Sequence, residues 1–396
     1  MALEAYKNFL HRCFRCGYCK LPTAYSHINC PSYQRYRMES YSPGGRLWLI
    51  RAVANKTLAP SRHYAHILYS CTMCGNCTTH CCLEFKDEIL RIVRAAREEL
   101  VEQSILPQSV QTYFENIYAF YNPWKKSKRK RGAWIKKTHI PIYDDGKEYL
   151  YYIGDIASYH PRVNAVCRAL GQLFLQAGVS FGVLGEKEIS DGNEVRDMGE
   201  TGLFEYLMEQ NMTTFRERGV EKIIAYSPHG FHAMKHYYKK RTETIAVFHY
   251  LEILQSILSK NRINLSSTCN PVKVTYHDSC FLGRWNQKYD LPRNVLKQIP
   301  GIQLVEMERN KEDAFCCGGG NGNVFTDLMG GDENSPARIR VREALKTRAQ
   351  IVAVSCPACL IMLEDAVESE GVGDMIKIMD VAEIVKSASV KAQDRQ

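Results

Sequence analysis

The stretch IVAVSCPAC, residues 351–359, decides the fold of the C-terminal part of the chain. Its first residues are apolar and mostly β-branched, as is typical of a buried strand. Cys356 and Cys359 follow that strand directly. Open α/β sheets bind ligands at the carboxyl ends of their strands, so this stretch predicts an α/β sheet with a cysteine site at its edge.

Strands and helices alternate around this stretch, and their order occurs twice. In the C-terminal part, we expect strands at 272–280 and 302–307, a helix around 292–299, and a helix capped by Ser335 with Pro336 at its first position. In the part before it, we expect strands at 149–155, 179–185 and 222–227 and helices at 162–178 and 204–219. Two successive units of about 120 residues indicate an internal duplication, each with a mainly parallel sheet surrounded by helices.

The first 105 residues contain nine of the sixteen cysteines. Two of their runs have the spacing C-x2-C-x2-C, which wraps a loop around one face of a 4Fe-4S cubane. In two-cluster ferredoxins the fourth ligand comes from the other motif. This pattern predicts two 4Fe-4S cubanes, one on Cys13, Cys16, Cys19 and Cys81, the other on Cys71, Cys74, Cys77 and Cys30.

The fourth ligand of each cubane has alternatives. Ten residues separate Cys19 from Cys30, where the ferredoxin run has three, and Cys82 competes with Cys81. A pair of structural zinc sites is another interpretation, although zinc sites usually use two separated cysteine pairs. A chain with this many cysteines in a reducing compartment favours metal or cluster binding over disulfides.

Five further cysteines form a second group near the C-terminus: Cys280, Cys316, Cys317, Cys356 and Cys359. Each follows a predicted strand or lies in a loop at a strand end. The glycines 318–320 leave backbone amides free to point at a negatively charged cluster. A nucleotide-binding glycine loop is the alternative for this segment, but the doubled cysteine has no role in such a loop.

The segments HDSC (277–280), FCCGGG (315–320) and SCPAC (355–359) resemble the CCG domain of heterodisulfide reductase catalytic subunits and of glycolate-oxidase iron–sulfur subunits. Together with the ferredoxin motifs, nearly the whole chain resembles the fused catalytic subunit of membrane-linked heterodisulfide reductases. The resemblance implies that the five C-terminal cysteines hold a noncubane 4Fe-4S cluster.

The first of the two units departs from this pattern. When it is laid on the second unit, Asp155 falls at Cys280, Ser190 and Asp191 fall at the cysteine pair, and Ser227 and Gly230 fall at Cys356 and Cys359. In the family that the chain resembles, both halves carry clusters, and their pairing is tied to disulfide cleavage. The loss of one set argues against that reaction here.

Three histidines of the first unit are candidate metal ligands. His229, His232 and His236 share one face if 228–238 is helical, and Asp155 or Asp191 would complete a site for a metal or a substrate anion. A hydrogen-bonded histidine face on a decayed site is the alternative.

Other single residues are weaker candidates. His277 and Asp278 precede a predicted ligand and are candidates for moving protons, or for structural hydrogen bonds. Arg284 and Arg293 are placed to offset cluster charge. Cys167 and Cys269 are interpreted as structural.

The net charge of +9 is concentrated in the segment 125–137, KKSKRKRGAWIKK, which holds no acid. Such a local run is either a solvated linker or a segment that docks to an acidic partner or to anionic lipid. Nucleic acid is not an expected partner. The chain has no run of about 18 apolar residues and no signal-peptide pattern at its start. We therefore expect a cytoplasmic protein, with peripheral association at the inner face of the membrane through 125–137 as an option.

These observations predict a multidomain α/β protein. We expect a mainly helical ferredoxin-type domain at 1–105, a basic and aromatic connector at 106–147, a CCG-like unit without cysteine ligands at 148–265 and an intact CCG unit at 266–388. The first domain should end in an amphipathic helix, because Ile89, Ile92, Ala96 and Leu100 recur at helical spacing. The expected function is electron transfer within a multi-subunit oxidoreductase, partnered by a flavoprotein, a ferredoxin or a membrane quinone-reactive subunit. A reductase acting directly on a disulfide and a zinc-bound scaffold are the alternatives.

Overall fold

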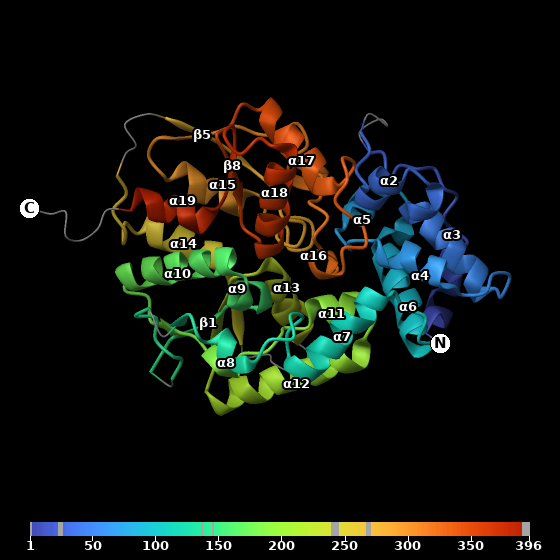
Figure 1. Cartoon of the computed structure of the whole chain (residues 1–396), viewed down its shortest axis with the longest axis horizontal. Coiled ribbons are helices and arrows are strands. Elements are labelled where there is room, and N and C mark those ends of the chain that lie inside the picture. The colour runs from blue at the N-terminus through green and yellow to red at the C-terminus, as the bar shows by residue number, and fades with distance from the viewer. Residues whose placement is uncertain are drawn as a thin grey trace, which may run out of the picture.

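The computed structural model describes residues 2–22, 27–135, 138–144, 146–238, 245–266 and 271–389. Cys269 and the last two lysines of the basic run, Lys136 and Lys137, lie outside these residues. Figure 1 shows a helical N-terminal group on one side and two α/β groups stacked beside it. The mixed α/β class predicted from the sequence is confirmed, with two four-stranded parallel sheets.

The N-terminal group consists of short helices arranged around the cysteine loops: α1 (Lys7–Leu10), α2 (Pro31–Tyr36), α3 (Pro43–Ala54), α4 (Arg62–Tyr69), α5 (Asn76–His80) and α6 (Ile89–Glu102). Ser42 caps α3 by accepting the N–H of Gly45 at 3.0 Å. The apolar residues of α6, spaced at helical intervals, are buried as the sequence predicts.

The first sheet has the strand order β2-β1-β3-β4, and all of its pairs are parallel. Its strands are β1 (Tyr149–Tyr152), β2 (Phe181–Gly182), β3 (Lys222–Ala225) and β4 (Ala246–His249). The helices of this unit are α9 (Asp155–Tyr159), α10 (Pro161–Gln176), α11 (Asn193–Asp197), α12 (Thr201–Glu217), α13 (Pro228–His236) and α14 (Tyr250–Ser259). The strand predicted at 179–185 is thus only two residues long.

The second sheet has the order β6-β5-β7-β8, again with parallel pairs. Its strands are β5 (Val272–Tyr276), β6 (Ile302–Leu304), β7 (Ile351–Val354) and β8 (Lys377–Asp380). Its helices are α15 (Asp290–Lys297), α16 (Asn323–Thr326), α17 (Pro336–Lys346), α18 (Pro357–Glu370) and α19 (Val381–Ala388). Ser335 caps α17 by accepting the N–H of Arg338, as the sequence predicts.

Matching residues begin matching helices in the two units. Ser227 precedes α13 after β3, Cys356 precedes α18 after β7, and each is followed by a proline. His249 and Asp380 each open the next helix with a reciprocal capping box. This correspondence, added to the shared strand order, supports the duplication and the superposition of Ser227 on Cys356.

The two faces of the first sheet belong to two different cores. Tyr151 of β1 packs into a core that continues through α10 and α14 into the second unit. Leu150 and Tyr152, on the opposite face, pack into a core shared with the N-terminal helices. Because a strand alternates its side chains between its faces, β1 ties all three groups together.

The connector packs along the first unit. It contains α7 (Gln108–Phe120) and α8 (Lys128–Arg131), drawn in teal beside α12 in Figure 1. Among the residues that the structure describes, no helix is both long and apolar enough to cross a membrane.

Candidate metal centres

The first predicted cubane site, which we call the outer site, is a cavity in the N-terminal group. Its lining includes the predicted ligands Cys13, Cys16, Cys19 and Cys81. Cys82 does not line this cavity, and its side chain is exposed. The structure therefore brings together the three cysteines of the first motif and Cys81 of the second motif, which we call the crossed set. The competing Cys82 lies outside it.

The second predicted site, the middle site, is a neighbouring cavity whose lining includes Cys30, Cys71, Cys74 and Cys77, again the crossed set. The lengthened loop before Cys30 is held by the second α/β unit, because Arg309 donates to the carbonyl of Ile28 at 2.7 Å and to Oδ1 of Asn29 at 3.2 Å. Gly75, inside the second cysteine run, has a φ of +79°, which a residue with a side chain rarely adopts.

The five C-terminal cysteines converge at the inner site, where the loops after β5 and β7 meet the glycine-rich loop. All five are buried. The Sγ atoms of Cys317 and Cys359 lie 3.4 Å apart, and the amide of Gly318 donates to Sγ of Cys316 at 3.3 Å. The backbone amide thus points at a ligand sulfur, as the glycine run predicts.

The chemistry of these donor sets fits iron–sulfur clusters. Thiolates are the ligands that such clusters use, and each cubane site gathers four while the inner site gathers five. Burial and the neighbouring thiols raise the pKa of Cys77 well above its ordinary value. Buried, crowded thiols of this kind ionise when a cationic centre binds them, which couples metal binding to proton release.

The middle and inner sites adjoin one another. Cys74, of the middle set, and Cys280 and Cys316, of the inner set, belong to one small buried cluster with Phe281. The hydroxyl of Thr72 lies 3.8 Å from Sγ of Cys316. A Cβ on Gly320 would lie only 2.6 Å from the carbonyl oxygen of Thr72, so the two loops approach as closely as glycine permits.

Two neighbouring residues fasten this junction. Arg284 is buried and donates to the carbonyl of Cys74 at 3.1 Å and, from Nε, to the carbonyl of Glu312 at 3.0 Å. Trp285 donates from Nε1 to the carbonyl of Met73 at 2.9 Å. The Arg284 guanidinium therefore brings a positive charge to the boundary between two sites that would hold negatively charged clusters.

The outer and middle sites also adjoin. Pro43 and Ile89 line both cavities. Asn76 of the middle loop donates to the carbonyl of Cys19 in the outer loop at 2.9 Å. The three candidate sites thus form one series, from outer through middle to inner.

His277 and Asp278 have different surroundings. A ring nitrogen of His277 lies within 4.8 Å of Sγ of Cys317 and of Cys359, while its Nδ1 accepts a hydrogen bond from Nε of Arg340 at 3.1 Å. Burial and the Arg340 charge lower the pKa of His277 to about 3. Asp278 instead binds Arg293 through both carboxylate oxygens, at 2.8 and 2.9 Å, which gives it a structural partner.

In the first unit, a connector arginine pairs with Asp155, the residue that falls at Cys280 when the two units are compared by sequence. Arg131 of α8 is buried and ion-paired with Asp155 and Glu188. The Glu188 carboxylate accepts the backbone N–H groups of Ile153 and Gly154, at 3.0 and 2.9 Å. The basic run is therefore only partly a solvated linker, because this arginine is an internal part of the fold.

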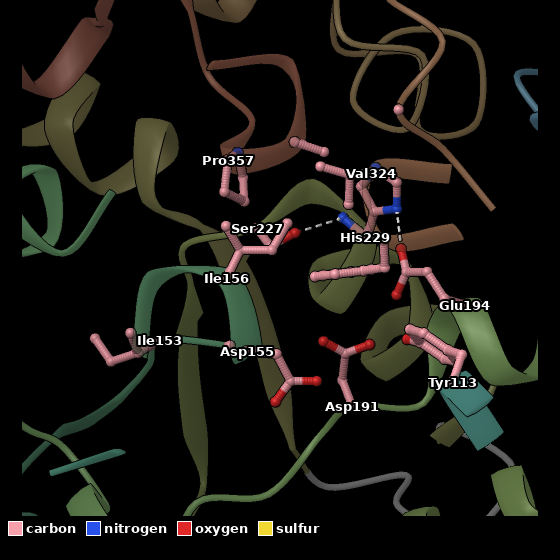
Figure 2. A pocket seen from close by; sticks show the side chains of 14 residues that line it. Tyr113, Ile153, Asp155, Ile156, Asp191, Glu194, Ser227, His229, Val324 and Pro357 are labelled. Atoms are coloured by element: carbon pink, nitrogen blue, oxygen red, sulfur yellow. Dashed lines mark hydrogen bonds and ion pairs between the residues drawn. The ribbon is translucent and has the colours of Figure 1, made fainter. Parts of the chain in front are cut away.

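A small cavity separates the first unit from the inner site (Figure 2). Asp155, Asp191 and Glu194 face it from one side, and Pro357, the first residue of α18, faces it from the other. Its free volume is about 30 Å³, which is room for about two water molecules.

His229 lies between this cavity and the inner site. Its Nδ1 is 2.5 Å from the Glu194 carboxylate, and its ring stacks on Phe281 with centroids 4.0 Å apart. Burial opposes ionisation of the Cys356 thiol, but hydrogen bonds from Cys359 and from His229 hold its pKa well below the ordinary value. An imidazole of the first unit thus favours the ionised form of a predicted ligand of the second.

The three histidines predicted to share a metal do not form one three-ligand group, although the rings of His232 and His236 lie side by side with centroids 4.6 Å apart. His229 faces Glu194, whereas His232 lies 2.9 Å from the hydroxyl of Tyr237. His236 is 2.9 Å from Oδ1 of Asn286. This arrangement fits the alternative of a hydrogen-bonded histidine face.

Several residues that hold the sites together carry no signal in the sequence. Arg97 is buried and donates to the carbonyls of Cys71 and Asp197 and to Oδ1 of Asn321, so it joins the three groups of the fold. Arg46 is buried beside Cys30, where it opposes the rise in the thiol pKa that burial causes. A buried arginine carries no local signature, because it sits among polar residues of a helix like any exposed one.

Comparison with known proteins agrees with the two cysteine regions. Residues 9–84 match the family model of the 4Fe-4S dicluster domain, and residues 274–364 match that of the CCG cysteine-rich domain. The chain is 28% identical over 399 residues to a dihydromethanophenazine:CoB–CoM heterodisulfide reductase subunit from Methanosarcina barkeri, covering 96% of this chain and 94% of that relative.

Two longer relatives are more similar in sequence. The EtfAB:quinone oxidoreductase of Syntrophomonas wolfei is 36% identical over 81% of this chain and 46% of its own length. The probable iron-sulfur-binding oxidoreductase FadF of Bacillus subtilis is 31% identical over 83% of this chain and 48% of its own length. The chain therefore spans about half the length of these two proteins.

Proposed function

We propose that this chain, a heterodisulfide reductase-like iron–sulfur protein with a 4Fe-4S dicluster domain and a CCG cysteine-rich domain, is the electron-transfer subunit of a larger oxidoreductase. The crossed cysteine sets would hold two 4Fe-4S cubanes at the outer and middle sites, and Cys280, Cys316, Cys317, Cys356 and Cys359 would hold a noncubane 4Fe-4S cluster at the inner site. When bound, these clusters supply one-electron carriers.

The observation that carries the proposal is the contact between the middle and inner sites. Cys74 and Cys316 lie in one buried cluster, and Gly320 lets their loops approach closely. Arg97 donates to the carbonyl of Cys71 and Arg284 donates to the carbonyl of Cys74, so both arginines hold the cysteine loop of the middle site in place. The chain's own residues thereby keep three electron-carrying sites adjacent and exclude water between the last two.

The first unit favours a conduit over a disulfide reductase. Asp155, the residue that falls at Cys280 when the two units are compared by sequence, pairs there with Arg131. The cavity between the first unit and Pro357 has a free volume of only about 30 Å³, which is too small for a disulfide substrate. A wider cavity of about 420 Å³ is lined by Met73, His232 and Trp285, so the preference for a conduit rests on the missing cysteine ligands and not on lack of space.

The names of the relatives suggest the kinds of partner. One relative is part of a heterodisulfide reductase, and the longer relatives include an EtfAB:quinone oxidoreductase. We propose a flavoprotein, a ferredoxin or a membrane quinone-reactive subunit as the partner of this chain. Association with a membrane would then be peripheral or through that partner.

The test is anaerobic purification of the full chain, followed by metal analysis and a redox titration monitored by electron paramagnetic resonance. We expect about 12 iron atoms per chain and three cluster signals. We also expect reduced methyl viologen to reduce the clusters without sustained turnover of cystine or of the CoM–CoB heterodisulfide. An iron-free, zinc-loaded protein would support the scaffold alternative, and sustained disulfide reduction by the chain alone would support the reductase.

A further inference from the structure

The outer site is the end of the series that lies nearest to solvent. Phe14, between two predicted ligands of this site, is 64% exposed, and Trp48 of α3 is 37% exposed. By contrast, all five cysteines of the inner site are buried. Exposed aromatic side chains directly beside a redox site mark a surface where another molecule docks.

Trp48 is connected to the outer site by its polar edge. Its Nε1 donates to the carbonyl of Cys13 at 2.9 Å. The guanidinium of Arg15 lies over the indole ring at 4.3 Å from the centroid, and that of Arg51 lies at 5.4 Å. The aromatic surface is therefore fixed in place and covered by positive charge.

No acid offsets this charge within the two segments that build the surface. Residues 7–22 and 43–58 contain lysines and arginines but no aspartate or glutamate. Arg12 and Arg15 are exposed, and Arg51 is half-buried. Aromatic residues and arginine are the types that dominate the energetics of protein interfaces.

The basic run, the other positive segment of the chain, is less suited to docking. Its Arg131 and Trp134 are buried, and the charge of Lys128 is 4.0 Å from the ring centroid of Tyr121. It also lies on the first unit, next to the position that has lost its cluster ligands. A partner bound there would meet no electron carrier directly.

We propose that Phe14 and Trp48, with Arg15 and Arg51 over the indole ring, form the docking surface for an acidic electron-carrier protein at the outer site. The inference rests on the proposed function and names the kind of partner that this end of the series takes. Acidic groups on the partner would pair with the arginines and speed the encounter, while an apolar patch would cover Phe14.

The test uses the cluster-loaded full chain and a flavodoxin chosen for its acidic surface. Stopped-flow spectroscopy measures cluster reduction by reduced flavodoxin at low salt in the wild type, in Arg15→Glu/Arg51→Glu and in Phe14→Ser. The matched control is Arg129→Glu/Lys130→Glu, which makes the same charge change on α8. Dithionite reduction and iron content verify that each variant holds its clusters.

We expect the Arg15→Glu/Arg51→Glu chain to react with flavodoxin about tenfold more slowly than the wild type, with the difference shrinking as salt rises, and the control to react as the wild type does. Equal rates for the two double variants would overturn the proposal while leaving the proposed function intact. Binding to phosphatidylglycerol vesicles is measured in the same variants. If Arg15→Glu/Arg51→Glu loses this binding while its flavodoxin rate equals that of the wild type, the surface faces lipid and the proposal is overturned. Failure of the proposed function itself would appear separately, as absent or irreducible clusters.

Discussion

Arg131 is ion-paired with Asp155, the residue that stands at the position of Cys280 when the two α/β units are superposed by sequence. Arg131 also binds Glu188 at 3.0 Å, and both it and Glu188 are almost completely buried. Burial raises the pKa of Asp155 and of Glu188, and the Arg131 charge opposes that rise. The first unit thus has a buried network of one arginine and two carboxylates at this position, and the network depends on the connector.

Replacing Arg131 by Gln should destabilise the fold, because two buried carboxylates would lose their counter-charge. Removing one partner of a buried ion pair costs about 3–5 kcal/mol. Urea denaturation of the cluster-loaded chain measures the effect. Arg129→Gln, on the same helix with an exposed side chain, should change stability by less than about 0.5 kcal/mol. Equal midpoints for the two variants would mean that the network is not needed.

If each cubane takes its fourth ligand from the other cysteine motif, replacing that one cysteine should disrupt one cubane and leave the other intact. We expect Cys30→Ser to disrupt the middle cluster and Cys81→Ser the outer one, because each residue lines only that cavity. Iron content should fall from about 12 atoms towards about 8, and one cubane signal should change. Cys82→Ser is the control, since Cys82 is exposed. A loss of iron in that control, with Cys81→Ser intact, would reverse the assignment of the fourth ligand.

His229 predicts a measurable influence of the first unit on the inner site. Hydrogen bonds to ligand sulfurs stabilise the more negative, reduced cluster and raise its potential. His229→Leu removes the imidazole that stabilises the Cys356 thiolate and should lower the midpoint potential of the inner cluster, leaving those of the two cubanes unchanged. His236→Leu is the matched control, because the partner of that imidazole is Asn286 at an exposed position. Redox titration of the paramagnetic signals decides the outcome, and an unchanged inner potential would contradict the prediction.

The elements that can be predicted from the sequence are those that a few adjacent residues specify. The C-x2-C-x2-C spacing, the helical periodicity of α6 and the Ser335–Pro336 start of α17 each rest on a few adjacent residues, and the structure has them where the sequence predicts them. The strand predicted at 179–185 is too long, because only Phe181 and Gly182 pair with β1. The next residue, Val183, pairs instead with Ile142 of the connector, and a Cβ on Gly182 would lie 2.5 Å from the backbone of Tyr143.

The parts of the site that the sequence does not reveal depend on distant pairs. Arg131 and Asp155 come from the connector and the first unit, and a run of basic residues shows nothing in its sequence that would distinguish a buried arginine from its exposed neighbours. The sequence indicates His229 as a candidate only as a member of a helical face. Its partners Glu194 and Cys356 come from other elements, and no spacing rule connects residues so far apart.

Asp380 predicts a pH dependence of stability. Burial raises the pKa of this carboxyl to about 7, while the N–H of Ala382 and the hydroxyl of Tyr250 oppose the rise. The unfolded value is about 3.9, so the folded chain holds a proton that the unfolded chain has released. Stability therefore falls as pH rises between about 4 and 7.

Asp380→Asn tests this sign. An amide oxygen keeps the cap and cannot ionise, so the variant should gain stability relative to the wild type as pH rises from about 4 to about 8. Tyr226 and Tyr250 donate to this carboxyl, and the Glu383 carboxylate accepts the backbone N–H of Asp380. All three remain in both proteins, so the difference between the two stability curves isolates the Asp380 carboxyl. Parallel curves for the two proteins would refute the assignment.

Gly320 sets how closely the middle and inner sites approach. A Cβ there would lie 2.6 Å from the carbonyl oxygen of Thr72, and backbone cannot yield as a flexible side chain does. Gly320→Ala should therefore push the two loops apart. We expect slower electron transfer from the cubanes to the inner cluster, measured by freeze-quench paramagnetic resonance after a pulse of reductant. Gly331→Ala is the matched control, because nothing lies within 4 Å of the added methyl. If both variants retain three clusters and transfer electrons at the wild-type rate, the close contact between the loops does not control the transfer, and the path between the sites must run through another contact, such as the one between Cys74 and Cys280.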